Sequence, residues 1–304
     1  MPKFTIFTPT FNRAHTLHRP FLSLMAQSYK DFEWLVIDDG STDQTENLLN
    51  EMKQKATFSC RIIAQGNCGK HVAFNRGVRE ARGELFVNLD SDDELLPDAL
   101  ENMLSIWTTL NQNLHLELIG VTGLCVDQTG KIVGGAFPSD KMIMSSKELY
   151  FRFGDLGEKF GFQRTEVLKK YPFPESPGIK FVAEGFVWFQ ISESYKTLFV
   201  NTPFRRYHRN TNDLEALSVV NDFADVAASR VDFYRCVLES ESSLIKFSVL
   251  RYFKAAVSFW RCQIHLNTHK YPRLKSFLGL ALVIAGLPIG FLLYAYDQTR
   301  KIRK

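Results

Sequence analysis

Strand-like and helix-like segments alternate over the first 95 residues, and this alternation constrains the fold more than any other feature of the chain. The expected strands are short runs rich in Ile, Val, Leu or Phe, at 4–8, 32–37, 61–64 and 85–89, and the expected helices between them are 16–28, 43–55 and 70–81. This order is typical of an α/β protein with a mostly parallel central sheet flanked by helices.

The later chain predicts a continuation of this domain and then a helical region. A helix at 97–107 and a strand at 116–126 continue it as α+β structure. Helices are then expected at 221–239 and 243–266, followed by an uncharged run at 276–296. We therefore expect one domain over 1–215, with halves 1–110 and 111–215, and a helical C-terminal region over 216–304.

Composition and cysteine usage narrow the class of protein. With 45% apolar and 23% charged residues among 304, the chain has globular composition, which excludes disorder, collagen and coiled coil. The five cysteines are an odd number without Cys-x-x-Cys spacing, which argues against a disulfide framework and a structural zinc site. No signal-peptide pattern precedes the first strand, so we expect a reducing, cytosolic location.

The positive charge lies in the C-terminal tail. The chain carries +4 in total, but residues 271–304 hold six Lys or Arg against one Asp, a net +5, which leaves −1 for residues 1–270. No nucleic-acid-binding face is therefore expected.

Two acidic segments follow predicted strands. Residues 38–43 read Asp-Asp-Gly-Ser-Thr-Asp, and residues 88–93 read Asn-Leu-Asp-Ser-Asp-Asp. Ligands of such sheets gather at the carboxyl ends of strands, where a carboxylate can accept hydrogen bonds from a base or ribose. A turn and a helix N-cap would explain part of each segment, but crowded carboxylates repel one another and commonly surround a divalent cation. The oxygen ligands predict Mg²⁺ or Mn²⁺ shared with a diphosphate.

A third segment, residues 67–77, lies between these two and carries polar residues at a predicted helix start. Asn67 and Gly69 predict a turn, Lys70 is placed to face phosphate charge, and Asn75 follows on the helix. His71 is interpreted as a surface or packing residue.

Together these segments resemble the family 2 glycosyltransferases, whose nucleotide-sugar-binding fold is the α/β type called GT-A. Residues 8–13 match the family's opening strand and loop, 38–43 its acidic turn, 67–77 its Asn-x-Gly…Ala-x-Asn-x-Gly segment, and 90–93 its Asp-x-Asp signature. The resemblance is strong to about residue 110 and thinner to about 210. It implies a nucleotide-binding half over 1–110 and an acceptor-binding half over 111–215.

The resemblance also implies roles for individual residues at the strand ends. Phe11 would stack on the nucleobase, Asp39 would hydrogen-bond it, and Asp90 would lie near the ribose. Asp92, with Asp90 beside it, would hold Mn²⁺ or Mg²⁺ on the diphosphate. The other expected donor-binding residues are Thr8, Pro9 and Thr10, which would line the base pocket, and Asn12, Arg13, Lys70, Asn75 and Ser91.

Family 2 enzymes generally invert the anomeric centre and place a carboxylate base before a Trp-containing helix. The matching segment here reads Ala183-Glu184-Gly185-Phe186-Val187-Trp188, where the family often has a Glu-Asp pair. The match implies that Glu184 is the base, and its apolar neighbours predict a raised pKa suited to taking a proton from a hydroxyl. An exposed Glu in an aromatic-rich loop is the alternative. The cations of residues 205–209, including His208, either close over the diphosphate or form a basic surface turn.

The uncharged run 276–296 is long enough to cross a bilayer, since its 21 residues would span about 31 Å as a helix. The basic flanks, together with Pro288 between Gly286 and Gly290, favour a kinked or hairpin-like segment that dips into the cytosolic leaflet, with a single span as the alternative. Residues 243–266 predict a basic amphipathic helix that lies on the membrane or packs on the domain.

The sequence therefore predicts an inverting, metal-dependent glycosyltransferase that moves a sugar from a nucleotide diphosphate donor to a hydroxyl of a lipid-linked glycan acceptor. It would act in cell-surface polysaccharide synthesis at the cytoplasmic side of the bacterial inner membrane, attached through its C-terminal tail. Two alternatives remain: a sugar nucleotidyltransferase, whose usual Gly-rich loop is replaced here by Thr8-Pro9-Thr10, and a non-catalytic membrane assembly module of the same fold.

Overall fold

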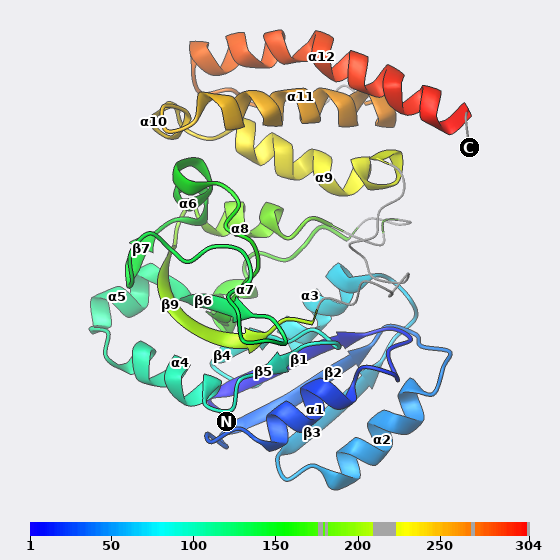
Figure 1. Ribbon diagram of the computed structural model, residues 1–304, viewed down its shortest axis with the longest axis vertical. Coiled ribbons are helices and arrows are strands. Elements are labelled where there is room, and N and C mark those ends of the chain that lie inside the picture. The colour runs from blue at the N-terminus through cyan, green and yellow to red at the C-terminus, as the bar shows by residue number, and fades with distance from the viewer. Residues whose placement is uncertain (176–178, 180–181, 209–222, 269–270, 303–304) are drawn as a thin grey trace. The chain divides into compact units, whose positions relative to one another are not determined.

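The computed structural model describes residues 1–304 except 176–178, 180–181, 209–222, 269–270 and 303–304 (Figure 1). The chain forms two compact units whose segments alternate along the sequence. The first unit contains Met1–Met144, Leu156–Lys180 and Ser194–Asn210, and the second contains Ser145–Asp155, Phe181–Glu193 and Thr211–Lys304. The second unit thus takes two segments that precede residue 215.

The first unit is built on one sheet, in which the described strands follow the order β3-β2-β1-β4-β8-β6-β9-β5, with β7 paired to β9. The first four strands are parallel and confirm the four predicted in the first 95 residues; β8, β5 and β7 are antiparallel to their neighbours. The strands are β1 Phe4–Thr10, β2 Phe32–Asp38, β3 Ser59–Ala64, β4 Leu85–Asn88, β5 Glu94–Leu95, β6 Leu118–Val126, β7 Met142–Met144, β8 Lys159–Arg164 and β9 Lys196–Arg206.

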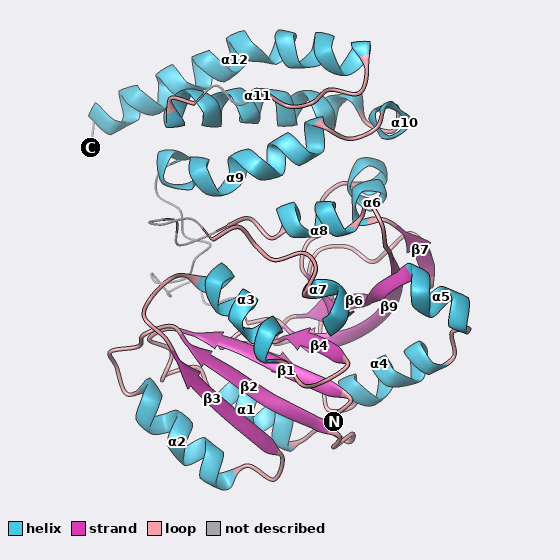
Figure 2. Cartoon of the chain, turned by 180° about the vertical axis from the view of Figure 1, so that it is seen from behind, coloured by secondary structure: helices cyan, strands magenta, loops and turns pink. Residues whose placement is uncertain are grey.

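Helices cover both faces of the parallel strands, which explains why every residue of β1 and β2 is buried. Helices α1 (His18–Met25) and α2 (Thr45–Lys55) lie on one face, and α3 (Lys70–Glu80) lies on the other (Figure 2). On the α3 side the rings of Phe7, Phe74 and Phe86 pack together. A Cβ on Gly77 would meet the Phe7 ring, so glycine allows α3 its close approach to the sheet.

The remaining helices of this unit differ slightly from expectation. Helix α4 spans Ala99–Thr108, close to the predicted 97–107, and α7 spans Thr165–Leu168. The strand predicted at 116–126 begins at Leu118, because the short helix α5 (Gln112–Glu117), with its N-terminus capped by the Asn111 side chain, precedes it.

The second unit is helical, with its own core. Its helices are α6 Ser146–Phe153, α8 Gly185–Ile191, α9 Phe223–Leu238, α10 Ser242–Ile245, α11 Val249–Leu266 and α12 Phe277–Ile302. The single helix predicted at 243–266 is in fact two, since Ser248 breaks the run and caps α11 by accepting a hydrogen bond from the Arg251 amide.

Helix α11 packs between α9 and α12 (Figure 1). Its buried face includes Tyr252, Ala256 and Phe259. The spacing predicts an apolar stripe of Phe253, Val257, Trp260 and Ile264, of which Val257 is buried and the other three are partly exposed. On the predicted basic stripe, Arg261 and His265 pair with Asp297 of α12. Two of the four residues of that stripe, which consists of Arg251, Lys254, Arg261 and His265, are therefore paired inside this unit, and contact of the helix with a membrane stays a prediction.

Helix α12 runs without interruption from Phe277 to Ile302 and contains Pro288, so the hairpin-like form of the favoured prediction is wrong. Within the described residues it supplies one segment, Phe277–Thr299, whose length and composition would suit a membrane span.

Candidate active site

The loop after β1 is fastened to the loop after β2. Asn12 adopts a left-handed backbone with φ of 53°, and its side-chain Oδ1 accepts a hydrogen bond from the Thr42 amide at 2.8 Å. The amide of Asn12 donates to Ser41 Oγ at 2.9 Å, and the amide of Arg13 donates to Thr45 Oγ1 at 3.1 Å. These bonds fix the turn that presents Phe11, whose side chain is 42% exposed. A rigid turn with an exposed ring at a strand end is a suitable platform for stacking.

Asp39, one residue beyond β2, secures the loop that leads into α3. It is 5% exposed, and its carboxylate accepts hydrogen bonds from Gln65 Nε2 at 2.8 Å, the Cys68 amide at 2.9 Å and the Gly69 amide at 2.7 Å. Bonds of backbone amides to a carboxylate are among the stronger neutral–charged bonds. Asp39 therefore sets the position at which Lys70 begins α3.

The acidic segment after β4 is a turn held by internal cations. Lys70 Nζ lies 2.7 Å from Oδ1 of Asp90, and the buried guanidinium of Arg205 lies 3.7 Å from Oδ2 of the same residue. Arg205 also lies 3.1 Å from Asp93 Oδ2 and 2.9 Å from Glu158 Oε2. No described side chain hydrogen-bonds the carboxylate of Asp92, which lies between these two paired aspartates in the sequence.

Charge and burial set the ionisation of the three aspartates. Burial alone would raise the pKa of Asp90, but Lys70 and Arg205 outweigh it and hold that pKa below its ordinary value. Burial and the neighbouring charge of Asp90 raise the pKa of Asp92. Burial also raises the pKa of Asp93 to about 7, although Arg205 opposes the change. A raised carboxyl pKa means that the anion at Asp92 is incompletely compensated, which is the electrostatic condition that a bound cation relieves.

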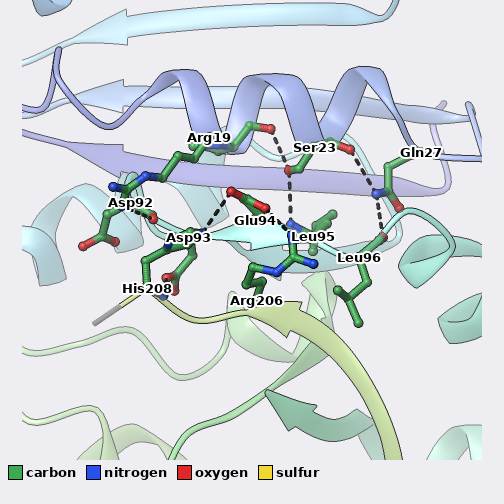
Figure 3. Close-up of polar contacts among 11 residues, drawn as sticks. Arg19, Ser23, Gln27, Asp92, Asp93, Glu94, Leu95, Leu96, Arg206 and His208 are labelled. Atoms are coloured by element: carbon green, nitrogen blue, oxygen red, sulfur yellow. Dashed lines mark hydrogen bonds and ion pairs between the residues drawn. The ribbon is translucent and has the colours of Figure 1, made fainter. Parts of the chain in front are cut away.

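Helix α1 holds the backbone of this acidic segment from the other side (Figure 3). Arg19 donates to the carbonyl oxygen of Asp92 at 3.1 Å, and the amide of Leu95 donates to Ser23 Oγ at 3.1 Å. Gln27 Nε2 donates to the carbonyl of Leu96 at 2.8 Å. The segment is thus fixed along its length before any ligand binds.

The end of β9 adds a second set of polar contacts beside the turn (Figure 3). The His208 amide donates to Asp93 Oδ1, and its Nε2 lies 2.9 Å from Glu94 Oε1. Arg206 pairs with Glu94 at 2.8 Å. Because Arg205 is 4% exposed, the alternative of a basic surface turn is wrong for that residue; Arg209 lies outside the described residues.

Three expected donor-binding residues are enclosed by the fold instead. Thr8 and Pro9 are buried in β1, and the Thr8 hydroxyl accepts a hydrogen bond from the Trp34 indole at 3.0 Å. Asn75 is 3% exposed and binds the 173–175 segment, with Nδ2 donating to the Phe173 carbonyl at 2.9 Å and Oδ1 accepting from the Phe173 amide at 2.9 Å. These three side chains are packed in the interior of the unit, and their contact with the donor stays a prediction. Thr10 and Ser91 are also buried.

Glu184 belongs to the second unit, at the residue that precedes α8. Its side chain is exposed, so the apolar enclosure expected around it is not formed by the described residues. Val182 is buried, while Phe186 and Trp188 are partly exposed, and Phe181 lies outside the described residues.

The carboxylate oxygen atoms at the acidic turn fit a cation that is shared with a phosphate ligand. Among the described residues, no group of three or more His, Cys, Asp or Glu side chains could hold a metal by itself. Asp92, with Asp90 nearby, offers hard oxygen ligands, and Mg²⁺ commonly takes only one or two carboxylates with the rest from water and phosphates. The turn therefore fits Mg²⁺ or Mn²⁺ provided that the ligand supplies oxygen atoms.

Comparisons with known proteins agree with this architecture. Residues 5–115 match the family model of glycosyl transferase family 2. The chain is 26% identical to an uncharacterised glycosyltransferase of Nostoc, over 94% of this chain and 89% of that protein. It is 27% identical to the GalNAc(5)-diNAcBac-PP-undecaprenol beta-1,3-glucosyltransferase of Campylobacter jejuni, over 81% of this chain and 77% of that protein.

Solved structures share the fold. The structure of Staphylococcus aureus TarS residues 1–349 in complex with UDP-GlcNAc aligns with a TM-score of 0.62 at 16% identity, over 97% of this chain and 92% of that one. A Pyrobaculum calidifontis mannosyltransferase in complex with GDP-Man and Mn²⁺ aligns with a TM-score of 0.57 at 15% identity, over 97% and 88%. The fold and the acidic strand ends define a GT-A glycosyltransferase. Residues 5–115 match glycosyl transferase family 2, and the chain is a glycosyltransferase.

Proposed function

We propose that this glycosyltransferase moves a sugar, with inversion, from a nucleoside diphosphate donor to a hydroxyl of a lipid-linked glycan acceptor, and that it requires a divalent cation. The observation that carries the proposal is the placement of an exposed Phe11 ring and the Asp92 carboxylate, which no described side chain hydrogen-bonds, after two strands of one sheet. Both follow neighbouring parallel strands, β1 and β4, and so lie at the same edge of the sheet. That edge is where α/β sheets bind nucleotides.

The proposed donor site divides the nucleotide between these two features. Phe11 stacks on the nucleobase, with the turn at Asn12 holding the ring in place. Arg13 acts electrostatically on both Asp90 and Asp92, so it lies close enough to the turn to face the diphosphate. Lys70, at the N-terminus of α3, supplies a second cation, and the helix dipole there also favours phosphate.

A cation held by Asp92 would stabilise the charge that develops on the departing diphosphate. In the proposed displacement the acceptor oxygen forms a bond to the anomeric carbon while the bond from that carbon to the phosphate oxygen breaks. The bonding electrons leave with the nucleoside diphosphate, and the proton of the acceptor hydroxyl passes to Glu184. One displacement of this kind inverts the anomeric centre.

The lipid-linked acceptor and the membrane location rest on two supports. The Campylobacter relative is named for a substrate carried on undecaprenol pyrophosphate. In the present chain, α12 supplies an apolar segment suited to a membrane. We propose that the protein acts at the cytoplasmic face of a bacterial inner membrane, where it extends cell-surface polysaccharide.

The test is a panel of UDP-, GDP- and dTDP-sugars, scored for nucleoside diphosphate release with Mn²⁺, with Mg²⁺ and with EDTA. We expect EDTA to abolish release and Asp92→Ala to remove the metal-stimulated part while the protein stays folded. Asp98→Ala, which changes an exposed aspartate six residues further on, is the matched control. Metal-stimulated release by Asp92→Ala at the wild-type rate would refute the site, and pyrophosphate release would instead indicate a nucleotidyltransferase.

Two further measurements test the finer parts of the proposal. Glu184→Gln should keep donor affinity and lower transfer by about 100-fold or more, as expected for loss of a general base. Equal turnover would place the base elsewhere. Transfer should favour a polyprenyl-diphosphate-linked acceptor over the free sugar, and an absence of that preference would contradict the lipid-linked acceptor.

A further inference from the structure

Helix α12 has one face packed and the other open. Its most buried described positions are Gly279, Val283, Gly286, Gly290 and Asp297, at spacings of four, three, four and seven residues. This spacing places them on one stripe of the helix. The stripe contacts α11 along the same length, and the two helices lie side by side in both ribbon views (Figures 1 and 2).

Small residues bring α12 close to α11. A Cβ on Gly286 would lie 3.1 Å from Ala256 Cβ, and one on Gly290 would lie 2.8 Å from Trp260 Cβ. The Trp260 indole donates to the carbonyl of Val283 at 2.8 Å. Glycine at these positions therefore allows backbone-level packing that any larger side chain would push apart.

An ionic contact fastens the far end of the same stripe. The carboxylate of Asp297, which is 8% exposed, accepts hydrogen bonds from Arg261 Nε at 2.7 Å and from its second guanidinium nitrogen, and lies 2.8 Å from His265 Nε2. Moving α12 away from α11 would break this contact and leave a buried charge without its partner, which is costly.

The opposite face of α12 is an apolar surface, which we call the outer strip. No charged residue occurs from 276 to 296. The outer strip consists of large apolar side chains that are between 41% and 85% exposed: Phe277, Leu278, Leu280, Ile284, Leu287, Ile289, Phe291, Leu292 and Tyr296. Nine such side chains along one helix exceed what a soluble surface usually exposes.

We infer that α12 is an in-plane membrane anchor: it stays packed on α11 and buries the outer strip in the interfacial region of a bilayer, without crossing it. This inference rests on the membrane part of the proposed function and specifies how the contact is made. Lipid is the occupant that fits, because the strip offers no charge or salt-bridge partner to a protein. Exposed Arg273 and Lys275, which precede the helix, are complementary to anionic headgroups.

The α11 contact argues against a span. Helix α11 runs beside α12 and carries Arg251, Lys254, Arg261 and His265, so a crossing α12 would either drag these groups into hydrocarbon or lose its packed stripe and the Asp297 contact. An in-plane position keeps both and still removes the outer strip from water.

The first test is flotation of the full chain with phosphatidylcholine vesicles that contain 0 or about one quarter phosphatidylglycerol. We expect binding that increases with the anionic lipid, and a loss of about tenfold or more when Ile284 and Phe291 are both changed to Glu. The matched control is Leu22→Glu with Leu116→Glu, two exposed apolar residues of the first unit. The inference would be overturned if the two α12 substitutions left vesicle binding unchanged, or if the two control substitutions reduced it equally.

Donor hydrolysis in detergent separates this inference from the proposed function, since it should be equal in all these variants. A chain that hydrolyses donor but does not bind vesicles would refute the anchor alone. If Ile284→Glu with Phe291→Glu instead converts a dimer to a monomer without changing vesicle binding, the strip is a contact between two copies and the inference is wrong.

The second test separates an in-plane helix from a span. Lys275→Cys and Thr299→Cys, each in a separate variant, place thiols at exposed positions on both ends of α12. In inverted vesicles from expressing bacteria we expect a membrane-impermeant maleimide to label both introduced thiols, with the labelled residue identified by mass spectrometry. The extent of labelling should equal that measured after detergent is added. Protection of Thr299→Cys until detergent is added would show a span and overturn the inference.

Discussion

Asn75→Ala tests whether this polar residue of α3 stabilises the fold or binds the donor. In the structure its side chain makes two hydrogen bonds with the backbone of Phe173, as donor and as acceptor, and a third with Glu175 Oε1 at 2.8 Å. Phe173 lies 98 residues further along the chain and is 4% exposed. The substitution therefore leaves a buried amide and a buried carbonyl without these partners.

The expected cost follows from the two bonds to Phe173. Each neutral hydrogen bond contributes about 1 kcal/mol, and buried groups left unsatisfied add to this loss, so the free energy of unfolding should fall by about 3 kcal/mol. The bond to Glu175 adds little, because that side chain is 42% exposed. A loss of this size corresponds to a melting temperature lower by roughly 6–12 °C.

Thermal melting followed by circular dichroism, together with the donor KM at a temperature where both proteins are folded, decides the question. We expect a lower melting temperature and a KM within about twofold of wild type, since the hydrogen bonds of Asn75 to the Phe173 backbone hold it inside the fold. Asn47→Ala on α2, which removes one exposed hydrogen bond to Gln44, is the control and should change little. An unchanged melting temperature with a KM raised tenfold would refute the structural role.

Three other predictions concern the exposed Phe11 ring, the close packing of α11 against α12, and the ionic contact between these two helices. Phe11→Ala should raise the donor KM roughly tenfold through lost base stacking, measured by nucleoside diphosphate release, with stability changed by less than about 0.5 kcal/mol because the ring is exposed; an unchanged KM would remove Phe11 from the site. Gly290→Ala should lower the free energy of unfolding by about 1 kcal/mol in urea titration, since the new Cβ meets Trp260; a gain in stability would contradict the close packing. For Asp297, burial raises the pKa but the bonds from Arg261 and His265 outweigh it and lower the pKa below its ordinary value, so its contribution to stability is present above the unfolded carboxyl pKa of about 3.9 and is lost as the pH falls through the lower folded value. The stability difference between wild type and Asp297→Asn, followed downward from about pH 5, should therefore shrink below about pH 4; a difference that stays the same or grows below about pH 4 would refute this reasoning.

The parallel half of the sheet was predictable because its signals are local. Each of β1, β2 and β4 is a short apolar run buried by neighbours on either side, and the polar residues that follow mark where it ends. The turns at 10–14 and 38–45 bond to each other across about 30 residues, so their joint appearance in the sequence already indicated one site.

The parts that sequence reasoning missed depend on contacts between distant segments. Asn75 looks like a binding residue in the sequence, and only the fold brings the Phe173 backbone to it. The packed stripe of α12 did carry a local signal, the spacing of Gly279, Gly286 and Gly290, but an uncharged run gives no polar face to contrast with it. Asp297 was counted only as a charge in a basic tail, whereas its α11 partners lie more than 30 residues earlier.

At the acidic turn, the fold narrows the argument that repulsion among carboxylates predicts a cation. Repulsion among Asp90, Asp92 and Asp93 predicts a cation, but part of the compensation comes from the protein. Lys70 from α3 and Arg205 from β9 pair with Asp90, and Arg205 also opposes the rise in pKa that burial causes at Asp93. The repulsion argument therefore no longer requires two metal-binding aspartates. It now applies mainly to Asp92, whose pKa burial and the charge of Asp90 raise although Arg13 and Lys70 oppose the change. For this reason Asp92, rather than the whole Asp-x-Asp segment, is the position at which loss of metal dependence should separate from loss of the fold.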